Sequence, residues 1–170
     1  MRLINTDTLE FAEFMGPKTP PYAILSHTWE DGEVSLREMT DPSPSVASKN
    51  GYRKIVDYCR LAAGEDYGWA WIDTCCIDKT NHAELAESIN SMFRWYEEAV
   101  VCHVFLADLA ADAELEEALP RCRWFTRGWT LQELVAPKTV HFHNRSWVMR
   151  GTKANLITEL AAITGILETV

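Results

Sequence analysis

The sequence predicts an α/β domain, built on an open, mostly parallel β-sheet with helices on both faces. Short apolar runs without interruption are typical of strands that are buried on both sides. Longer segments between these runs carry apolar residues at helical spacing. Strands that alternate with helices form parallel sheets, and 170 residues suit one domain.

Four apolar segments are the expected strands of this sheet. They comprise residues 22–26, 69–73, 100–106 and 139–143. The first follows the proline pair Pro20-Pro21 and the second follows Gly68, and such residues commonly separate elements. The first three segments are apolar at successive positions, so we expect helices to cover both of their faces.

Four further segments carry apolar residues three and four positions apart, which predicts helices. They span residues 52–63, 85–96, 131–135 and 156–163. Residues 41–45, rich in proline and serine, are expected to form a loop. Because the chain ends soon after the last helical pattern, we expect residues 1–170 to be a single domain excised from a longer protein.

Composition limits the classes of binding partner and the cellular compartments that we expect for this protein. A formal net charge of −9 argues against nucleic acid or an anionic membrane as the main partner. The five cysteines include no C-x-x-C pair, which favours reduced thiols in a cytoplasmic protein and no zinc site. Neither a signal peptide nor a membrane span is expected, because no long apolar run occurs.

Polar and aromatic residues follow the expected strands at their carboxyl ends, where open parallel sheets bind ligands. Ser26 ends the first strand, His27 and Trp29 follow it, and Asp73 ends the second. Another group belongs to the third helical pattern and the residues before it. It consists of Arg127, Trp129 and Glu133. An aromatic ring and a carboxylate one helical turn apart can stack on a base and accept hydrogen bonds from sugar hydroxyls.

Structural roles are open for each of these residues. Glu133 is alternatively a helix-surface carboxylate paired with Arg127, and His27 and Trp29 are alternatively packing residues. Asp73 is alternatively a residue that orients the following loop. A thiol nucleophile at Cys75 or Cys76 with His27 as its base is not favoured, because free cysteines are commonly buried. We expect no metal site.

The same segments carry a family resemblance. The strings RLINTDTLEF, YAILSHTWEDGEV, WAWIDTCCIDK and RGWTLQELVAP occur in order between residues 2 and 137. They resemble the signature blocks of the fungal heterokaryon-incompatibility (HET) domain, which is similar to TIR domains. This resemblance implies a TIR-like, flavodoxin-like fold. Trp129 and Glu133 match the W-x-x-x-E pattern of plant TIR domains, in which the glutamate is the catalytic residue of an NAD glycohydrolase.

The resemblance implies a cell-death function in fungal allorecognition or innate immunity. Glu133 would cleave the nicotinamide–ribose bond of NAD, which is the substrate and not a cofactor. Ser26, His27, Trp29, Asp73, Arg127 and Trp129 would line the pocket. The domain would form a homo-oligomer when an upstream sensor, or another domain of the full-length chain, activates it. The alternative is a non-enzymatic adaptor that signals by homotypic interaction.

Overall fold

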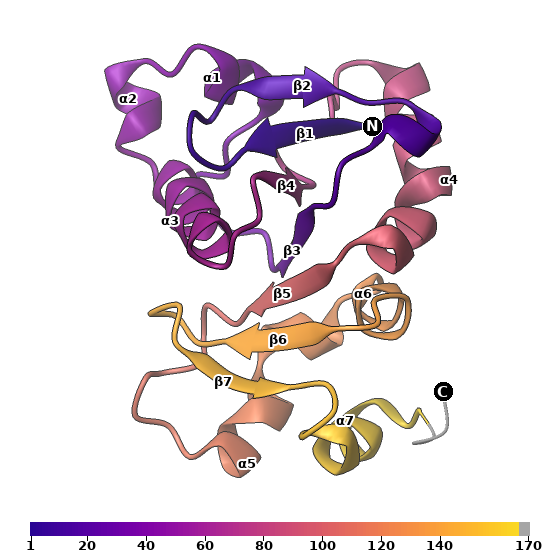
Figure 1. Cartoon of the computed structure of the whole chain (residues 1–170). Helices are drawn as coiled ribbons and strands as arrows, with labels where there is room; N and C mark the ends of the chain where they lie inside the picture. Colours follow the sequence, from indigo (N-terminus) through magenta and orange to yellow (C-terminus); the bar gives the residue numbers. More distant parts are fainter. Residues whose placement is uncertain (167–170) are drawn as a thin grey trace.

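A seven-stranded sheet forms the centre of the molecule, in the order β2-β1-β4-β3-β5-β6-β7 (Figure 1). The computed structural model describes residues 1–166. The four central strands run parallel. They are β3 (Ala23–His27), β4 (Trp69–Ile72), β5 (Val101–Phe105) and β6 (Val140–His143). Each coincides with an apolar run, so the predicted parallel centre is confirmed.

Three antiparallel strands extend this centre, and the sequence analysis missed all of them. They are β1 (Arg2–Asn5), β2 (Phe11–Glu13) and β7 (Met149–Thr152). β1 pairs with β2 and β4, and β7 pairs with β6. The predicted mostly parallel sheet is therefore confirmed at its centre, and the added strands make the whole sheet mixed. These strands are short and carry polar or exposed residues, so they lack the apolar runs of the buried strands.

Helices cover both faces of the sheet, as predicted (Figure 1). α3 (Asn50–Gly64) connects β3 to β4, whereas α4 (His82–Glu98) connects β4 to β5. These connections run in opposite directions along the sheet, so the right-handed crossover rule places the two helices on opposite faces. α6 (Thr130–Val135) packs against α4 and shares its face. α7 (Ile157–Thr164) follows β7.

Short helical segments fill the connections. They are α1 (Leu36–Thr40), α2 (Pro44–Ala47), α5 (Leu115–Ala118), and the 3₁₀ turns η1 (Gly16–Lys18), η2 (Leu119–Arg121) and η3 (Arg123–Thr126). The expected loop over residues 41–45 is correct only for its first part. Ser43 caps α2 by accepting a hydrogen bond from the amide of Val46, and Pro44 takes the first helical position. Proline suits that position because its missing N–H would have no partner there.

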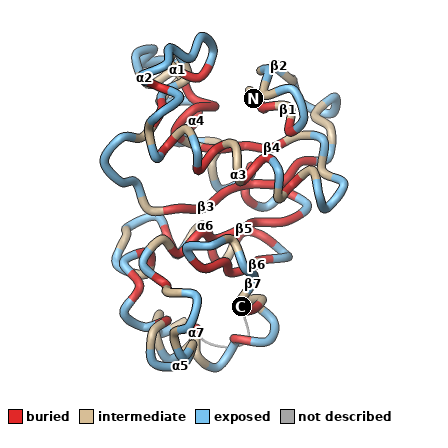
Figure 2. Tube along the Cα trace, turned by 90° about the vertical axis from the view of Figure 1, so that its left-hand side faces the viewer, coloured by how far each residue is buried: buried red, intermediate tan, exposed pale blue. Residues whose placement is uncertain are grey.

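Burial is concentrated along the central strands (Figure 2). All residues of β3 and β5 are buried. On the α4 face, Trp71 of β4 meets Trp95 and Tyr96 edge-on. All five cysteines are free and buried. Within residues 1–166, we find no helix whose length and apolar character would allow it to cross a membrane.

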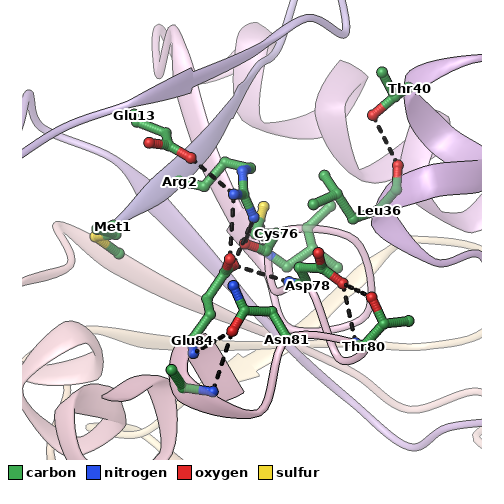
Figure 3. A network of polar contacts seen from close by, with 12 residues as sticks. Met1, Arg2, Glu13, Leu36, Thr40, Cys76, Asp78, Thr80, Asn81 and Glu84 are labelled. Atoms are coloured by element: carbon green, nitrogen blue, oxygen red, sulfur yellow. Dashed lines mark hydrogen bonds and ion pairs between the residues drawn. The ribbon is translucent and has the colours of Figure 1, made fainter. Parts of the chain in front are cut away.

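A polar network around Arg2 fixes the loop that follows β4 (Figure 3). The guanidinium of Arg2 donates to Glu84 at 2.6 Å, to Glu13 at 2.8 Å and to the carbonyl of Cys76 at 3.2 Å. Glu84 also accepts a hydrogen bond from the amide of Asp78 at 2.9 Å. Burial favours a higher pKa for Glu84, but these hydrogen bonds hold it below its usual value. The network joins β1, this loop and the start of α4.

At Gly51, α3 approaches the loop after β3 so closely that we expect one added methyl group to destabilise the protein. A Cβ at Gly51 would lie 2.5 Å from the carbonyl oxygen of Gly32 and 2.7 Å from Cα of Glu33. We expect Gly51→Ala to lower the free energy of unfolding by about 1–3 kcal/mol, as overpacking does. Urea unfolding measures this change.

Gly64→Ala, at the other end of the same helix, is the matched control. None of the described atoms lies within 4 Å of a Cβ built there. We expect this substitution to leave stability unchanged or to raise it by less than about 1 kcal/mol, because alanine favours helices. Equal unfolding midpoints for the two variants would contradict the packing described here.

Candidate active site

The last two residues of β3 direct their side chains into different clusters. Successive side chains of a strand point to opposite faces of the sheet. Ser26 therefore lies on the face covered by α4 and α6, and His27 belongs to the other side. The structure thus divides the predicted site residues into a buried group around Glu133 and a more exposed group around Asp73.

Glu133 is the centre of the buried group. This residue belongs to α6 and is buried. One carboxylate oxygen accepts a hydrogen bond from Ser26 Oγ at 2.5 Å. The guanidinium of Arg127 donates to both oxygens, at 2.8 and 3.0 Å, in a bidentate ion pair. Trp124 donates its indole N–H to Ser26 Oγ at 2.7 Å, which completes a continuous polar chain.

The turn before α6 sets this geometry. η3 buries Trp124, and the hydroxyl of Thr130 donates to the carbonyl of Trp124. The amide of Glu133 donates to the carbonyl of Trp129 at 3.1 Å, so the two residues lie one turn apart, as predicted. The two residues nevertheless differ in exposure, because Trp129 is 46% exposed and Glu133 is buried. The structure does not place this ring beside the carboxylate.

The structure shows the Arg127–Glu133 pairing that the sequence left open as an alternative, but in the interior of the protein and not on the helix surface. The Arg127 side chain is 18% exposed, whereas that of Glu133 is 4% exposed. A carboxylate placed so deep needs a charged partner, because burial without one is strongly unfavourable. In this conformation the guanidinium of Arg127 is held by the Glu133 carboxylate.

Asp73 is the centre of the second group. Its two carboxylate oxygens contact His27 Nε2 at 2.9 Å and the indole N–H of Trp29 at 2.7 Å. The ammonium of Lys79 lies 3.6 Å from the centroid of the Trp29 ring, which is a cation–π contact. Trp29 is 50% exposed, so its ring can be reached from solvent. Asp73 therefore orients both predicted partners from β3.

Electrostatics favour the charged form of the Asp73 carboxylate. Burial acts to raise the pKa of Asp73, but the hydrogen bond and charge of His27, the ammonium of Lys79 and the hydrogen bond from Trp29 outweigh it and lower this pKa. Burial lowers the pKa of Lys79, against the attraction of Asp73. His27 Nδ1 is buried and has no hydrogen-bond partner in the described part of the chain.

Both cysteines beside Asp73 are buried, and Cys75 disfavours the thiolate form. Burial, together with a hydrogen bond to Cys76, raises the pKa of Cys75 well above its usual value. Cys76 accepts a hydrogen bond from the amide of Ile72 at 3.3 Å and is also buried. The geometry agrees with a structural role for both thiols.

A larger and a smaller cavity are among those that open on the surface of the described residues. The larger, about 1110 Å³, lies beside Arg2, Tyr22 and the end of β2. The smaller, about 410 Å³, is lined by residues that include Glu33, Phe105 and Trp147. Neither is lined by a predicted site residue.

Comparison with known proteins decides the family. The sequence model described as "Heterokaryon incompatibility protein (HET)" matches residues 22–118. "Vegetative incompatibility protein HET-E-1" of Podospora anserina is 46% identical over 159 residues, which cover 88% of this chain. The chain belongs to the HET family. It spans 12% of the length of that relative, and no solved structure matches it.

The family match includes one part of the site and not the other. Ser26, His27, Trp29 and Asp73 lie inside the range that matches the HET model, whereas Arg127 and Glu133 follow its end. The sequence analysis of this HET chain missed Trp124, whose buried indole supports Ser26. The sequence does show a tryptophan three residues before Arg127, but it does not show that the ring of this tryptophan turns inward.

A third polar cluster was also missed. His103 of β5 lies close to His141 and His143 of β6 on the face of the sheet that α3 covers. The alternation His-x-His in β6 was a readable signal, since it places both rings on one face. His103 is far away in sequence, so only the register of β5 and β6 brings it to them.

Loss of the arginine should strongly destabilise this HET domain. Arg127→Met leaves the Glu133 carboxylate buried without a charged partner, so we expect a loss of roughly 3–5 kcal/mol in unfolding free energy. The double variant Arg127→Met/Glu133→Gln should recover part of this loss, because no charge remains buried. Arg121→Met, at an exposed arginine, is the control and should change stability by at most about 0.5 kcal/mol. Equal stabilities for Arg127→Met and Arg121→Met would show that the pair is not buried as described.

Proposed function

We propose that this HET-family chain is a cell-death effector domain of fungal allorecognition or innate immunity, which hydrolyses the nicotinamide–ribose bond of NAD in the cytoplasm. Family membership supports the allorecognition role. The observation that carries the enzymatic proposal is the Glu133 carboxylate, buried and hydrogen-bonded to Ser26 at the carboxyl end of β3. Ligands of open α/β sheets bind at such ends, where the order of strands reverses.

A TIR-like fold is part of the proposal. The four parallel strands, numbered along the chain, lie in the order 2-1-3-4, which agrees with flavodoxin-like sheets. The strand order reverses between β3 and β5. Ser26 lies at the end of β3, and the W-x-x-x-E spacing of Trp129 and Glu133 begins α6. These features support the carry-over of the catalytic role to Glu133.

The proposed chemistry uses one carboxylate. The bond between C1′ of the ribose and the nicotinamide nitrogen breaks, and its electron pair leaves with nicotinamide. The sugar develops oxocarbenium character, which a fixed carboxylate stabilises more than it stabilises neutral ribose. Water then adds to C1′ and loses a proton, which gives ADP-ribose. Nicotinamide is a good leaving group, so no second carboxyl group is needed as an acid.

Arg127 links binding to catalysis in this proposal. Its guanidinium holds both oxygens of Glu133, so the carboxylate is not free to face a ribose in this conformation. The pyrophosphate of NAD is a strong competitor for a guanidinium. Binding of NAD would draw Arg127 onto the pyrophosphate and release Glu133, which keeps its hydrogen bond from Ser26. The group around His27, Trp29 and Asp73 would receive a ring of the dinucleotide, and Trp129 would close the pocket.

A non-enzymatic adaptor is the second candidate, and one specific observation favours it. Large apolar side chains are exposed on α4 and α6, two helices that pack against each other. They are Ile89, Phe93, Trp129 and Leu131. Exposed apolar groups of this kind mark protein–protein contacts. Homotypic assembly through these helices, triggered by an upstream sensor or by another domain of the full-length chain, would serve either function.

Glu133→Gln should abolish NAD cleavage by the purified domain. The assay follows free nicotinamide at high protein concentration, with and without a crowding agent that promotes assembly. We expect turnover by the wild type and a loss of at least about 100-fold in Glu133→Gln, the scale set by removing an electrostatic group from an active site. Glu117→Gln, at an exposed glutamate of α5, is the control and should keep wild-type turnover.

The opposite pattern would favour the adaptor. Absence of turnover at every protein concentration, together with cell killing that survives Glu133→Gln, would contradict the enzymatic proposal. Under the adaptor reading, Phe93→Asp should abolish killing, because it places a charge in the exposed apolar face of α4.

A further inference from the structure

Three histidines converge on the face of the sheet opposite to Glu133. His103 is the register partner of His141, and Phe105 is the partner of His143, so all three rings project from neighbouring positions of β5 and β6. The centroid of the His103 ring lies 5.6 Å from that of His141 and 5.2 Å from that of His143. One nitrogen from each ring lies within 4.8 Å of the other two.

Each of these rings has one nitrogen without a hydrogen-bond partner among residues 1–166. The three atoms are His103 Nδ1, His141 Nδ1 and His143 Nε2, and all are buried. A buried polar atom without a partner costs about 1–3 kcal/mol, so native proteins contain few of them. Three such atoms in one cluster call for a ligand that all of them can share.

The opposite nitrogens of the two fully buried rings are held by protein. His103 Nε2 contacts the carboxylate of Glu65 at 3.1 Å. His143 Nδ1 contacts the carbonyl oxygen of Trp147 at 3.2 Å. Donation of an N–H to these oxygens leaves the lone pair on the unpartnered nitrogen of each ring. A carboxylate or carbonyl behind each imidazole is the usual outer support of a metal-binding histidine.

The two fully buried rings favour the uncharged form. Burial and the neighbouring His143 and His141 lower the pKa of His103 to about 3. Burial also lowers the pKa of His143. Neutral rings offer lone pairs to a cation at physiological pH.

We propose that His103, His141 and His143 bind a transition-metal ion of the Zn²⁺ class, with a fourth coordination position left to solvent. Imidazole nitrogen is a preferred donor for such ions, whereas Mg²⁺ and Ca²⁺ require oxygen. Zn–N bonds of about 2.0–2.1 Å separate two ligand nitrogens by about 3.4 Å, so the rings need to approach by at most about 1.4 Å. His141 is partly exposed and gives the ion an approach from solvent.

Aromatic side chains pack around the histidine cluster. Tyr58 of α3 meets the His103 ring edge-on at 5.7 Å and stacks on Trp147 at 5.8 Å. Trp147 adopts a left-handed conformation, with φ of 60°, which is rare for a bulky residue. Asn144 supports this turn through hydrogen bonds to its side chain from the amides of Ser146 and Val148. The hydroxyl of Tyr58 also lacks a partner within the described chain.

The proposed site is independent of NAD chemistry. It connects β5 with β6 and, through Glu65, with the end of α3. A bound ion would therefore hold the centre of the sheet together. This inference revises the expectation of no metal site, which the spacing of the cysteines suggested.

Zinc titration of metal-free protein tests the proposal. We expect one Zn²⁺ per chain by calorimetry and a rise in melting temperature on zinc addition, because an ion that binds only the folded state stabilises it. His141→Gln should weaken binding at least tenfold and remove the thermal shift. His82→Gln, at an exposed histidine of α4, is the matched control and should bind as the wild type does.

Two further measurements keep the test decisive if His141→Gln folds poorly. Glu65→Gln, at a partly exposed outer residue, should weaken zinc binding by about 10- to 100-fold in a folded protein. Co²⁺ bound to the wild type should give the visible spectrum of a nitrogen-ligated ion with no cobalt–thiolate charge-transfer band. A thiolate band, or zinc binding that His141→Gln and Glu65→Gln leave unchanged, would overturn the proposal.

Discussion

The buried ion pair between Arg127 and Glu133 is the interaction on which the arrangement of the site depends. It fixes the turn before α6 and holds the carboxylate against Ser26 of β3. A buried charge pair is seldom the most stabilising choice, since apolar residues of similar volume often stabilise as much. Our proposal therefore assigns this carboxylate, which Ser26 and the indole of Trp124 support, a function besides stability.

The last two residues of β3 place polar side chains on the two faces of the sheet. Ser26 joins the buried carboxylate, whereas the neighbouring His27 joins Asp73 and thereby the exposed ring of Trp29. A dinucleotide could engage both groups only by passing the end of the strand, and the ion pair at Arg127 would have to open. In our account the conformation described here is a resting state. The histidine cluster lies between β5, β6 and α3, where a metal ion would stiffen the same sheet.

Much of the fold could be predicted from the sequence, because β3, β4 and β5 are apolar at most positions and the helices keep a clear periodicity. β1, β2 and β7 could not, since these short strands on the two sides of the parallel centre carry polar residues such as Arg2 and Glu13. The position of Glu133 beside the carboxyl end of β3 was predictable from the order of strands and helices along the chain. Its salt bridge was only one of two readings, because sequence does not tell whether a side chain turns inward. The histidine cluster depends on strand register, which no local pattern encodes.

A crystal structure of the domain with an unhydrolysable NAD analogue tests the central claim most directly. Our account predicts that the Arg127 guanidinium leaves Glu133 and contacts the pyrophosphate, while a Glu133 oxygen faces the ribose attached to nicotinamide and keeps its contact with Ser26. An analogue bound elsewhere, with the bidentate pair intact, would contradict the account and leave the carboxylate a purely structural role.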